Sequence, residues 1–257
     1  MPLRETYSQA GIHQRWTSAY RRNPAQLAFD NEIYDYLFRT LKPAGTWVDA
    51  GCGSGERTVQ LARRCSAVIA VDISPDIQTA AKALAESEGL GGKIEFRCSP
   101  LEQLADIQAG NVHCRGVLMH IPDWRTCLEN LCRIVVPGGY LVLSEGNCRS
   151  LEALAARLGH RLKKRASKIA DTEGGLEFWS EIDGNPFLVR MADLDRVTRE
   201  AMSQGFEPVL RRPVQFMDLY RFPEWLRRAV IWINRIWFRL GLPFGSGVML
   251  VARKKTA

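Results

Sequence analysis

The 257-residue sequence lacks the residue patterns that hold metal ions or build disulfide frameworks. None of its seven cysteines stands in a C-x-x-C pair, and none of its four histidines belongs to a cluster with the spacing of metal ligands. The number of cysteines is odd, and several of them fall inside expected strands and helices. We therefore interpret the cysteines as reduced core residues, and we expect no metal site.

Long apolar runs are absent as well. No window reaches the roughly 18 uninterrupted apolar residues that a membrane-spanning helix needs, and residues 1–5 do not begin an apolar secretory segment. The sequence also contains no internal repeat and no low-complexity tract. We therefore expect a cytoplasmic globular protein, which fits its 46% of hydrophobic and 25% of charged residues.

Acidic residues are fewer than basic ones, so the formal net charge is +7. A basic balance can favour nucleic acid, anionic lipid or an acidic substrate, and it says nothing about the fold. The basic residues do not accompany a recognisable base-reading module. For this reason we expect no nucleic-acid partner.

Strand-like runs alternate with helical periods over residues 46–145. This alternation predicts an α/β fold in which a mostly parallel sheet carries helices on both faces. Strands are expected near residues 46–50, 67–72, 93–98, 112–118 and 140–145, and helices near 54–64, 75–89 and 123–135. Two further strand-like runs, at 206–212 and 246–253, follow a polar, glycine-rich stretch and a helix near 191–204.

The most informative stretch is a glycine-rich turn, Gly51-Cys52-Gly53-Ser54-Gly55, directly after the first apolar run. Glycine lets the backbone approach a ligand closely at the end of a buried strand. The third glycine comes one residue earlier than in the dinucleotide fingerprint, which disfavours an NAD-dependent oxidoreductase. Asp72 ends the next strand, and an acid at that strand tip can accept hydrogen bonds from two neighbouring ribose hydroxyls.

Residues 48–55 and 71–74 resemble the first two motifs of the class I S-adenosylmethionine (SAM) dependent methyltransferases. Residues 116–123 are similar to the end of that family's fourth strand, and residues 131–141 to its Pro-Gly-Gly turn into strand five. Four motifs at family spacing form a specific signal. The resemblance implies a doubly wound, Rossmann-like sheet of seven strands, six parallel and the last antiparallel, with SAM as cofactor and S-adenosylhomocysteine as product.

The resemblance also implies a domain organisation. Residues 1–42 would form a helical N-terminal lid, residues 43–149 the SAM-binding core, and residues 150–257 the C-terminal half of the sheet. Cap insertions over the substrate are expected at 150–190 and 213–245. The length of the chain suits a single domain overall.

By this resemblance the glycine turn would take the methionine end of SAM, organised by Asp49, while Asp72 would bind the ribose and Ile73 would pack on the adenine. Ser99 departs from the family, which often has an acid there against the adenine amino group. The expected cofactor-binding residues are Asp49, Gly51, Cys52, Gly53, Gly55, Asp72, Ile73, Ser99, Pro100, Leu101, Cys114 and Arg115.

Four further residues are candidates for work on the substrate. His120 follows the fourth strand, where a neutral imidazole can accept a substrate proton; the alternative is a histidine that only shapes the loop. Glu145, at the tip of strand five, is a second candidate base. Trp16 and Tyr20, one helical turn apart, would either fold over the cofactor or pack their helix on the sheet edge.

The resemblance implies methyl transfer, and the acceptor we expect is a hydroxyl of a small molecule, with a sugar or a lipid-linked glycan favoured. The alternatives are a C- or N-methyltransferase for a membrane amphiphile such as a quinone, and a non-catalytic SAM-binding protein. Helices at 150–169 and 224–240 are basic and amphipathic. They either contact the inner membrane face peripherally, or pack on the core, roof the pocket or form a homodimer face.

Overall fold

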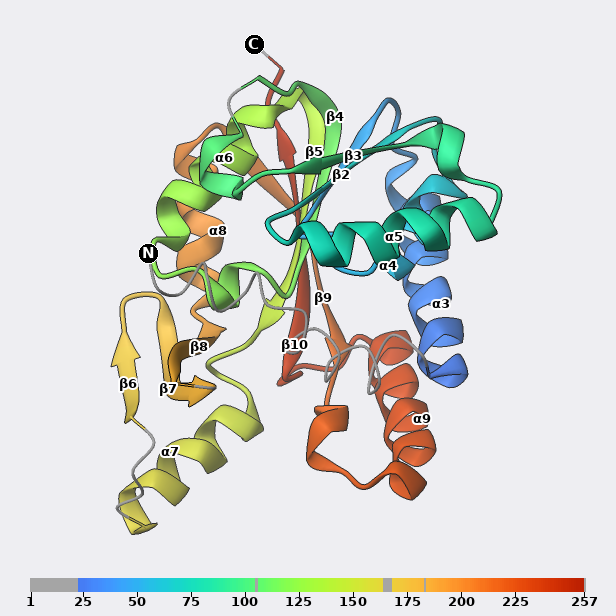
Figure 1. Cartoon of the computed structure of the whole chain (residues 1–257). Helices are drawn as coiled ribbons and strands as arrows, with labels where there is room; N and C mark the ends of the chain where they lie inside the picture. The colour runs from blue at the N-terminus through green and yellow to red at the C-terminus, as the bar shows by residue number, and fades with distance from the viewer. Residues whose placement is uncertain (1–22, 105, 164–167, 183, 257) are drawn as a thin grey trace.

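A central sheet organises the computed structural model, which describes residues 23–104, 106–163, 168–182 and 184–256. Its seven strands are β1 (Trp47–Ala50), β2 (Val68–Asp72), β3 (Ile94–Cys98), β4 (Ala109–Arg115), β5 (Val135–Gly146), β9 (Phe206–Gln215) and β10 (Gly247–Lys254). They lie in the order β3-β2-β1-β4-β5-β10-β9 (Figure 1). β10 runs antiparallel to both of its neighbours, whereas the other pairs are parallel. The predicted seven-stranded, doubly wound arrangement is therefore confirmed.

Helices cover both faces of this sheet (Figure 1). They are α3 (Pro24–Leu41), α4 (Glu56–Ala62), α5 (Pro75–Ser87), α6 (Trp124–Ile134), α8 (Leu194–Ser203) and α9 (Glu224–Leu240). One apolar cluster joins α6 and α8 to one face of the sheet, and a second joins α3, α4, α5 and α9 to the other face. The short central strands β1 and β2 are apolar on both faces, as a sheet covered on both sides requires.

Two helices begin at the residues that the sequence indicates. The Ser74 hydroxyl accepts a hydrogen bond from the Ile77 N–H at the start of α5, and Asp123 accepts one from the Thr126 N–H at the start of α6. Pro75 occupies the first turn of α5, where no intrahelical hydrogen bond is lost. Both helices are thus fixed where they leave the carboxyl-end side of the sheet.

Strands β4 and β5 both begin earlier than predicted. A Cβ atom on Gly139 would lie 2.0 Å from the carbonyl oxygen of Gly110, so only glycine permits this close approach of the two backbones. The Pro-Gly-Gly segment consequently joins the sheet instead of forming a separate loop. At the other end, Gly116 has a φ of +68° and ends β4 before the expected residue 118.

The largest difference from expectation lies in the first insertion. The helix predicted over 150–169 ends earlier, as α7 (Leu151–Lys163), and Ile169 belongs to a strand. The polar, glycine-rich stretch forms a three-stranded antiparallel sheet of β6 (Lys168–Thr172), β7 (Gly175–Ile182) and β8 (Asn185–Ala192). Alternate residues of β8, namely Leu188, Arg190 and Ala192, are buried, which is the period of a strand and not of a helix.

The interpretation of the cysteines as core residues holds only in part. All seven are free thiols. Cys98 is exposed and Cys65 is half-buried, while the other five are buried. The exposure of Cys98 follows from its place at the end of β3, the edge strand of the sheet.

Helix α3 packs against α9 through aromatic side chains. The ring of Phe238 meets those of Phe29 and Tyr36 edge-on, with centroids 5.8 and 5.4 Å apart. α3 lies within residues 1–42, for which the sequence predicts helical structure. The expected lid residues Trp16 and Tyr20 lie outside the described residues.

A buried asparagine attaches α9 to the end of β9. The side-chain oxygen of Asn234 accepts hydrogen bonds from the backbone N–H groups of Phe216 and Met217, at 2.8 and 2.9 Å. Its amide nitrogen donates to the Met217 carbonyl at 3.0 Å. Asn234 is only 2% exposed, so water cannot readily reach these three backbone groups and replace its hydrogen bonds.

We therefore expect Asn234→Ala to lower the free energy of unfolding by about 2–4 kcal/mol, since it leaves buried donors unsatisfied. Chemical denaturation followed by circular dichroism measures the change. Arg228→Ala, at an exposed position of the same helix, is the control and should stay within about 0.5 kcal/mol of the wild type. Equal losses in the two variants would contradict this account of Asn234.

Candidate active site

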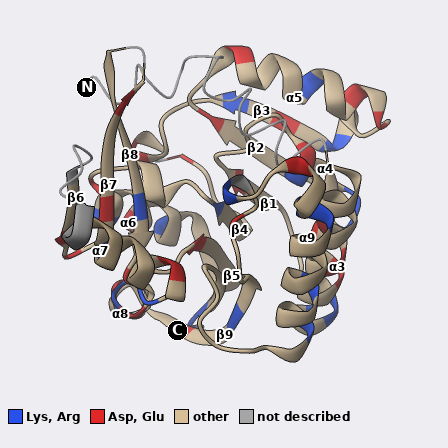
Figure 2. Ribbon diagram, turned by 90° about the horizontal axis from the view of Figure 1, so that it is seen from below, with Lys and Arg blue, Asp and Glu red and all other residues tan. Residues whose placement is uncertain are grey.

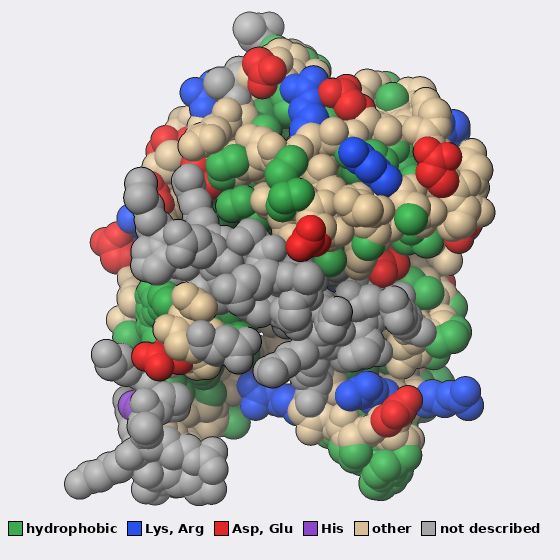
Figure 3. All heavy atoms as spheres, in the orientation of Figure 1, with side chains coloured by type: hydrophobic (Ala, Val, Ile, Leu, Met, Phe, Trp, Pro, Cys, Tyr) green, Lys and Arg blue, Asp and Glu red, His purple; other side chains and the backbone are tan. Residues whose placement is uncertain are grey.

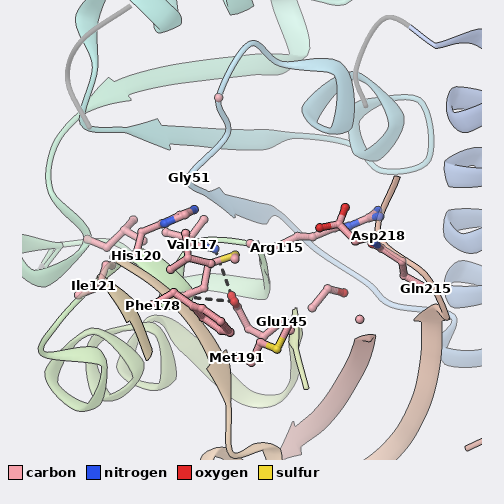
Figure 4. Close-up of a pocket in the computed structure, with 18 of the residues that line it drawn as sticks. Gly51, Arg115, Val117, His120, Ile121, Glu145, Phe178, Met191, Gln215 and Asp218 are labelled. Atoms are coloured by element: carbon pink, nitrogen blue, oxygen red, sulfur yellow. Dashed lines mark hydrogen bonds between the residues drawn. The ribbon is translucent and has the colours of Figure 1, made fainter. Parts of the chain in front are cut away.

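A cavity of about 570 Å³ lies at the carboxyl ends of the central parallel strands (Figure 4). This is the edge at which open α/β sheets bind their ligands, next to the point where strand order reverses between β1 and β4. Of the residues expected at the cofactor and substrate sites, those that line the cavity are Gly51, Gly53, Asp72, Ile73, Ser99, Pro100, Leu101, Arg115, His120 and Glu145.

The glycine turn packs closely at two places. Gly51 has a φ of +76°, and a Cβ atom there would lie 2.3 Å from a methyl carbon of Val117. At Gly55, with a φ of +88°, a Cβ atom would lie 3.0 Å from Ala81 of α5. Gly55 and the buried Cys52 do not line the cavity, so their expected contact with the cofactor is not supported; they pack the turn and α4 instead.

Asp72 and the glycine turn hold each other in place. The Gly53 N–H donates a hydrogen bond to Asp72 Oδ2 at 2.8 Å, and the Ser74 N–H donates to Oδ1 at 3.1 Å. A carboxylate has about four lone-pair sites, so each oxygen keeps an acceptor site beyond these two bonds. Asp72 lines the cavity and can therefore accept hydrogen bonds from a ligand there.

Asp49 lies behind the turn and not in the cavity, contrary to expectation. Its Oδ2 accepts a hydrogen bond from the Thr58 hydroxyl at 2.6 Å, and its Oδ1 pairs with His113 Nδ1 at 2.8 Å. Burial alone would raise the pKa of Asp49, but the hydrogen bonds from His113 and Thr58 and the charge of Arg57 outweigh it and lower the pKa. Asp49 is thus a structural carboxylate that stays ionised.

His113 completes this buried network. It stands directly opposite Asp49 in the pairing of β1 with β4, and its second ring nitrogen lies 3.2 Å from the hydroxyl of Tyr34 on α3. His113 was not among the residues that the sequence predicts for the site. Once the register of β1 and β4 is known, a buried histidine directly opposite an aspartate on the neighbouring strand indicates such a pair.

Only one of the two residues expected beside the methionine moiety reaches the cavity. Arg115 lines it and donates a hydrogen bond to Asp30 of α3 at 3.0 Å. Cys114 points the other way, into the core under α6, because successive residues of a strand face opposite sides. Burial raises the pKa of its thiol well above the usual value. The expectation for Cys114 is therefore not supported.

His120 lies in the short helix η4 (Leu118–His120) that follows β4. Its Nδ1 is 2.8 Å from the carbonyl oxygen of Leu188 in β8, and a carbonyl can only accept, so Nδ1 carries the proton. In the neutral imidazole Nε2 is then the acceptor nitrogen. This tautomer is the one that a base facing the cavity requires.

Glu145 is a buried carboxyl group in the wall of the same cavity (Figure 4). Its Oε1 accepts hydrogen bonds from the Val117 and Leu118 N–H groups at 3.1 Å, and Oε2 accepts one from the Met119 N–H at 3.2 Å. Burial raises the pKa of Glu145 to about 7, against the opposing effects of these donors and of the Arg190 charge. Glu145 can therefore take up or release a proton near neutral pH.

The far wall of the cavity is apolar and comes from the second sheet. Its residues are Phe178, Phe187, Val189 and Met191 of β7 and β8, next to Met119 and Ile121. Figure 4 shows Phe178 and Met191 beside Glu145, and Gln215 and Asp218 on the opposite side. A cap insertion over 150–190 was predicted from the sequence, but the strands β7 and β8 that form this wall were not.

Arg190 connects the second sheet to the loop that carries His120. The guanidinium is 3% exposed, pairs with Glu177 at 2.8 Å and donates hydrogen bonds to the carbonyl groups of Leu118, Ile121 and Pro122. Each of these bonds joins β8 to the segment that follows β4. The apolar wall and His120 are thus held at a fixed separation.

Among the described residues, no group of three or more His, Cys, Asp or Glu side chains is arranged to hold a metal ion. The walls of the cavity include side chains that can exchange a proton. Two such groups, His120 and Glu145, border one cavity together with Asp72.

Comparison with known proteins finds a match to part of this chain. Residues 48–143 match the family model described as a methyltransferase domain. A ubiquinone biosynthesis O-methyltransferase of Xanthomonas axonopodis pv. citri is 31% identical over 142 residues, which are 54% of this chain and 59% of that protein. One of Acinetobacter baylyi is 31% identical over 151 residues, 57% of this chain and 60% of the relative. The chain thus matches about 60% of the length of these relatives.

Solved structures also resemble this chain. Magnesium protoporphyrin IX methyltransferase from Synechocystis PCC 6803, with bound S-adenosylhomocysteine, has a TM-score of 0.64 at 17% identity and covers 98% of both chains. A SAM-dependent methyltransferase from Clostridium acetobutylicum has a TM-score of 0.63 at 10% identity, covering 96% of this chain and 99% of its own. These likenesses establish the fold. The chain has the fold of these SAM-dependent methyltransferases, and its residues 48–143 match a methyltransferase domain.

We expect Asp72→Ala to weaken the binding of S-adenosylhomocysteine by roughly a hundredfold, because two hydrogen bonds to a charged group, each worth roughly 1.5–3 kcal/mol, would be lost. Titration calorimetry measures the affinity. Asp76→Ala, at an exposed position of α5, is the control and should bind like the wild type. An unchanged affinity of the folded Asp72→Ala protein would remove Asp72 from the ribose site.

Proposed function

We propose that this protein transfers the methyl group of SAM to a hydroxyl group of a small molecule. The observation that carries the proposal is the presence of two proton acceptors, His120 and Glu145, in the cavity that Asp72 also lines. Methyl transfer to a hydroxyl needs a base for the released proton, whereas transfer to an amine lone pair or an activated carbon leaves less for a base to do. The presence of two candidate bases in the cavity therefore favours O-methylation.

SAM, when bound, supplies an electrophilic sulfonium methyl group. The cavity fits such a ligand in volume, since small-molecule sites commonly measure about 300–1,000 Å³. Asp72 would accept hydrogen bonds from the ribose hydroxyls, and Ile73 and Leu101 would flank the adenine. Arg115 is one of the cationic residues of the lining that can meet a carboxylate, and Ser99 is a polar residue of the same lining. These assignments rest on the lining of the cavity and on the family.

In the reaction the protein has two tasks. It must hold the acceptor oxygen in line with the methyl group and exclude water, which the enclosing second sheet supports. It must also take the hydroxyl proton. His120 Nε2 is an acceptor in the tautomer that Leu188 selects, and Glu145 is deprotonated above about pH 7. The base is whichever of the two side chains reaches the acceptor oxygen.

The apolar wall of Phe178, Phe187, Val189 and Met191 favours a flat, apolar acceptor such as a phenol ring. The relatives named ubiquinone biosynthesis O-methyltransferases agree with this choice. A sugar or lipid-linked glycan, which the sequence analysis favoured, would depend on the polar side of the cavity alone and is the second candidate. The cytoplasmic location and a homodimer stay predictions.

The test of the proposal is turnover. Purified protein is incubated with isotopically labelled SAM and matched sets of phenols and sugars, and labelled product and S-adenosylhomocysteine are quantified. Equal amounts of methylated phenol and S-adenosylhomocysteine are expected. Tight binding of S-adenosylhomocysteine without turnover on any acceptor would instead support a non-catalytic SAM-binding protein.

For His120→Ala we expect the rate at saturating acceptor to fall by about 10²–10⁴-fold if His120 is the base, the usual range for a lost general base. Its affinity for S-adenosylhomocysteine should stay within about twofold of the wild type, because Asp72 and the glycine turn are untouched. A full rate at saturating acceptor would leave His120 with the structural task of binding the Leu188 carbonyl.

The pH profile separates the two bases. A carboxyl group with a pKa of about 7 is mostly protonated at pH 6 and mostly ionised at pH 8, so a rate that depends on ionised Glu145 should rise through pH 7. Glu145→Gln should abolish that rise, while His120→Ala should retain it. A rise that survives in Glu145→Gln would exclude Glu145 as the base.

A further inference from the structure

Two helices near the cavity carry large apolar side chains on their outer sides. On α9, Trp225 is 78% exposed and Trp232 is 63% exposed. On α7, Leu151, Leu154 and Leu158 are each about half exposed. Residues three, four and seven apart share one side of a helix, so each set forms a stripe along its helix. Packing in the protein core therefore does not explain the apolar side chains of either stripe.

Both helices lie at the same end of the molecule, beyond the carboxyl ends of the parallel strands (Figure 1). Seen from that end, they stand on opposite sides of β4 and β5 (Figure 2). The cavity reaches this end, because Glu152 of α7 and Arg221 of η5 (Leu219–Arg221) line it and form an ion pair with each other. The two stripes therefore flank one end of the candidate active site.

The charges around the stripes are mainly basic. Arg228 and Arg239 are exposed on the same side of α9 as Trp225 and Trp232, and acidic residues do not interrupt this side. Arg239 shares Glu32 of α3 with a second arginine, which leaves a net positive charge there. Figure 3 shows apolar side chains gathered over α9, with arginine or lysine side chains and an acidic side chain next to them.

Tryptophan beside arginine on one side of a helix is the composition of helices that lie in the headgroup layer of a membrane. None of the helices in the described residues is long and apolar enough to cross a bilayer. The basic charge complements anionic lipid headgroups.

We propose that the outer sides of α7 and α9 form a docking face for an anionic lipid bilayer. On such a surface the end of the cavity that Glu152 and Arg221 line faces the lipid. An amphiphilic acceptor can then pass from the bilayer to the apolar wall of β7 and β8 without crossing bulk water. The delivery of an acceptor rests on the proposed methyltransferase function, whereas the docking itself does not.

Vesicle binding tests the face. The full chain is mixed with phosphatidylcholine vesicles that contain or lack phosphatidylglycerol, and the bound fraction is measured by sedimentation together with tryptophan emission. Binding is expected to the anionic vesicles, with a blue shift of the emission, and should weaken strongly as salt rises to about 0.5 M. Equal binding to both kinds of vesicle, or no binding to either, would overturn the proposal.

Substitutions locate the contact. Trp225→Ser with Trp232→Ser, and separately Leu154→Ser with Leu158→Ser, should each weaken vesicle binding about tenfold. Arg228→Gln should weaken it about fivefold, the effect of one basic residue near an anionic surface. The control is Met202→Ser with Val209→Ser, two comparably exposed apolar residues on α8 and β9. Losses as large in the control would overturn the assignment of the face.

Two further measurements keep this proposal separate from others. The tryptophan variant should bind S-adenosylhomocysteine like the wild type, so a failure of cofactor binding in the wild type would count against the proposed function and not against the face. Sedimentation velocity tests the other possible occupant of the face, a second copy of the chain. If the wild type is a dimer, the tryptophan variant is a monomer and neither binds vesicles, the face is a subunit interface and docking to lipid is overturned.

Discussion

The carboxylate of Asp49 is the buried charge around which the site is assembled. A charge removed from water is costly unless donors surround it, so β1, α4 and β4 can pack only when Thr58 and His113 reach Asp49 together. This requirement sets the register of the two central strands and the starting point of the glycine turn. Asp72 then holds the same turn from the opposite side through the Gly53 N–H. The ligand-facing edge is thus fixed between two carboxylates.

A comparison of Asp49 with Glu145 shows how donors decide what a buried carboxyl group does. Both are almost inaccessible to solvent. Asp49 is bonded by an imidazole and a hydroxyl and feels a nearby arginine, which together lower its pKa. Glu145 is bonded by three uncharged backbone N–H groups, which do not overcome burial, so its pKa rises to about 7. One group keeps its charge and supports structure, and the other is able to exchange a proton.

The central sheet could be predicted because its signals are local: short apolar runs, the glycines at 51–55 and the helix caps at Ser74 and Asp123. The ligand-facing position of Asp72 followed from the end of one strand. The pairing of Asp49 with His113 could not be predicted, because it depends on how two strands align and the two residues are 64 positions apart in the sequence. The second sheet was missed because its buried positions include the charged Arg190, which breaks the apolar alternation that identifies a strand.

The four contacts of Arg190 make the insertion and the loop after β4 a single mechanical unit. An exchange of β7 and β8 for those of another protein with this fold would leave the carbonyl groups of that loop without their donor unless the loop were exchanged as well. Changes in the apolar wall of the cavity during evolution are therefore expected to proceed by paired substitutions in these two segments. The strands β1, β2 and β3, with which Arg190 forms none of these bonds, are free to stay constant while they vary.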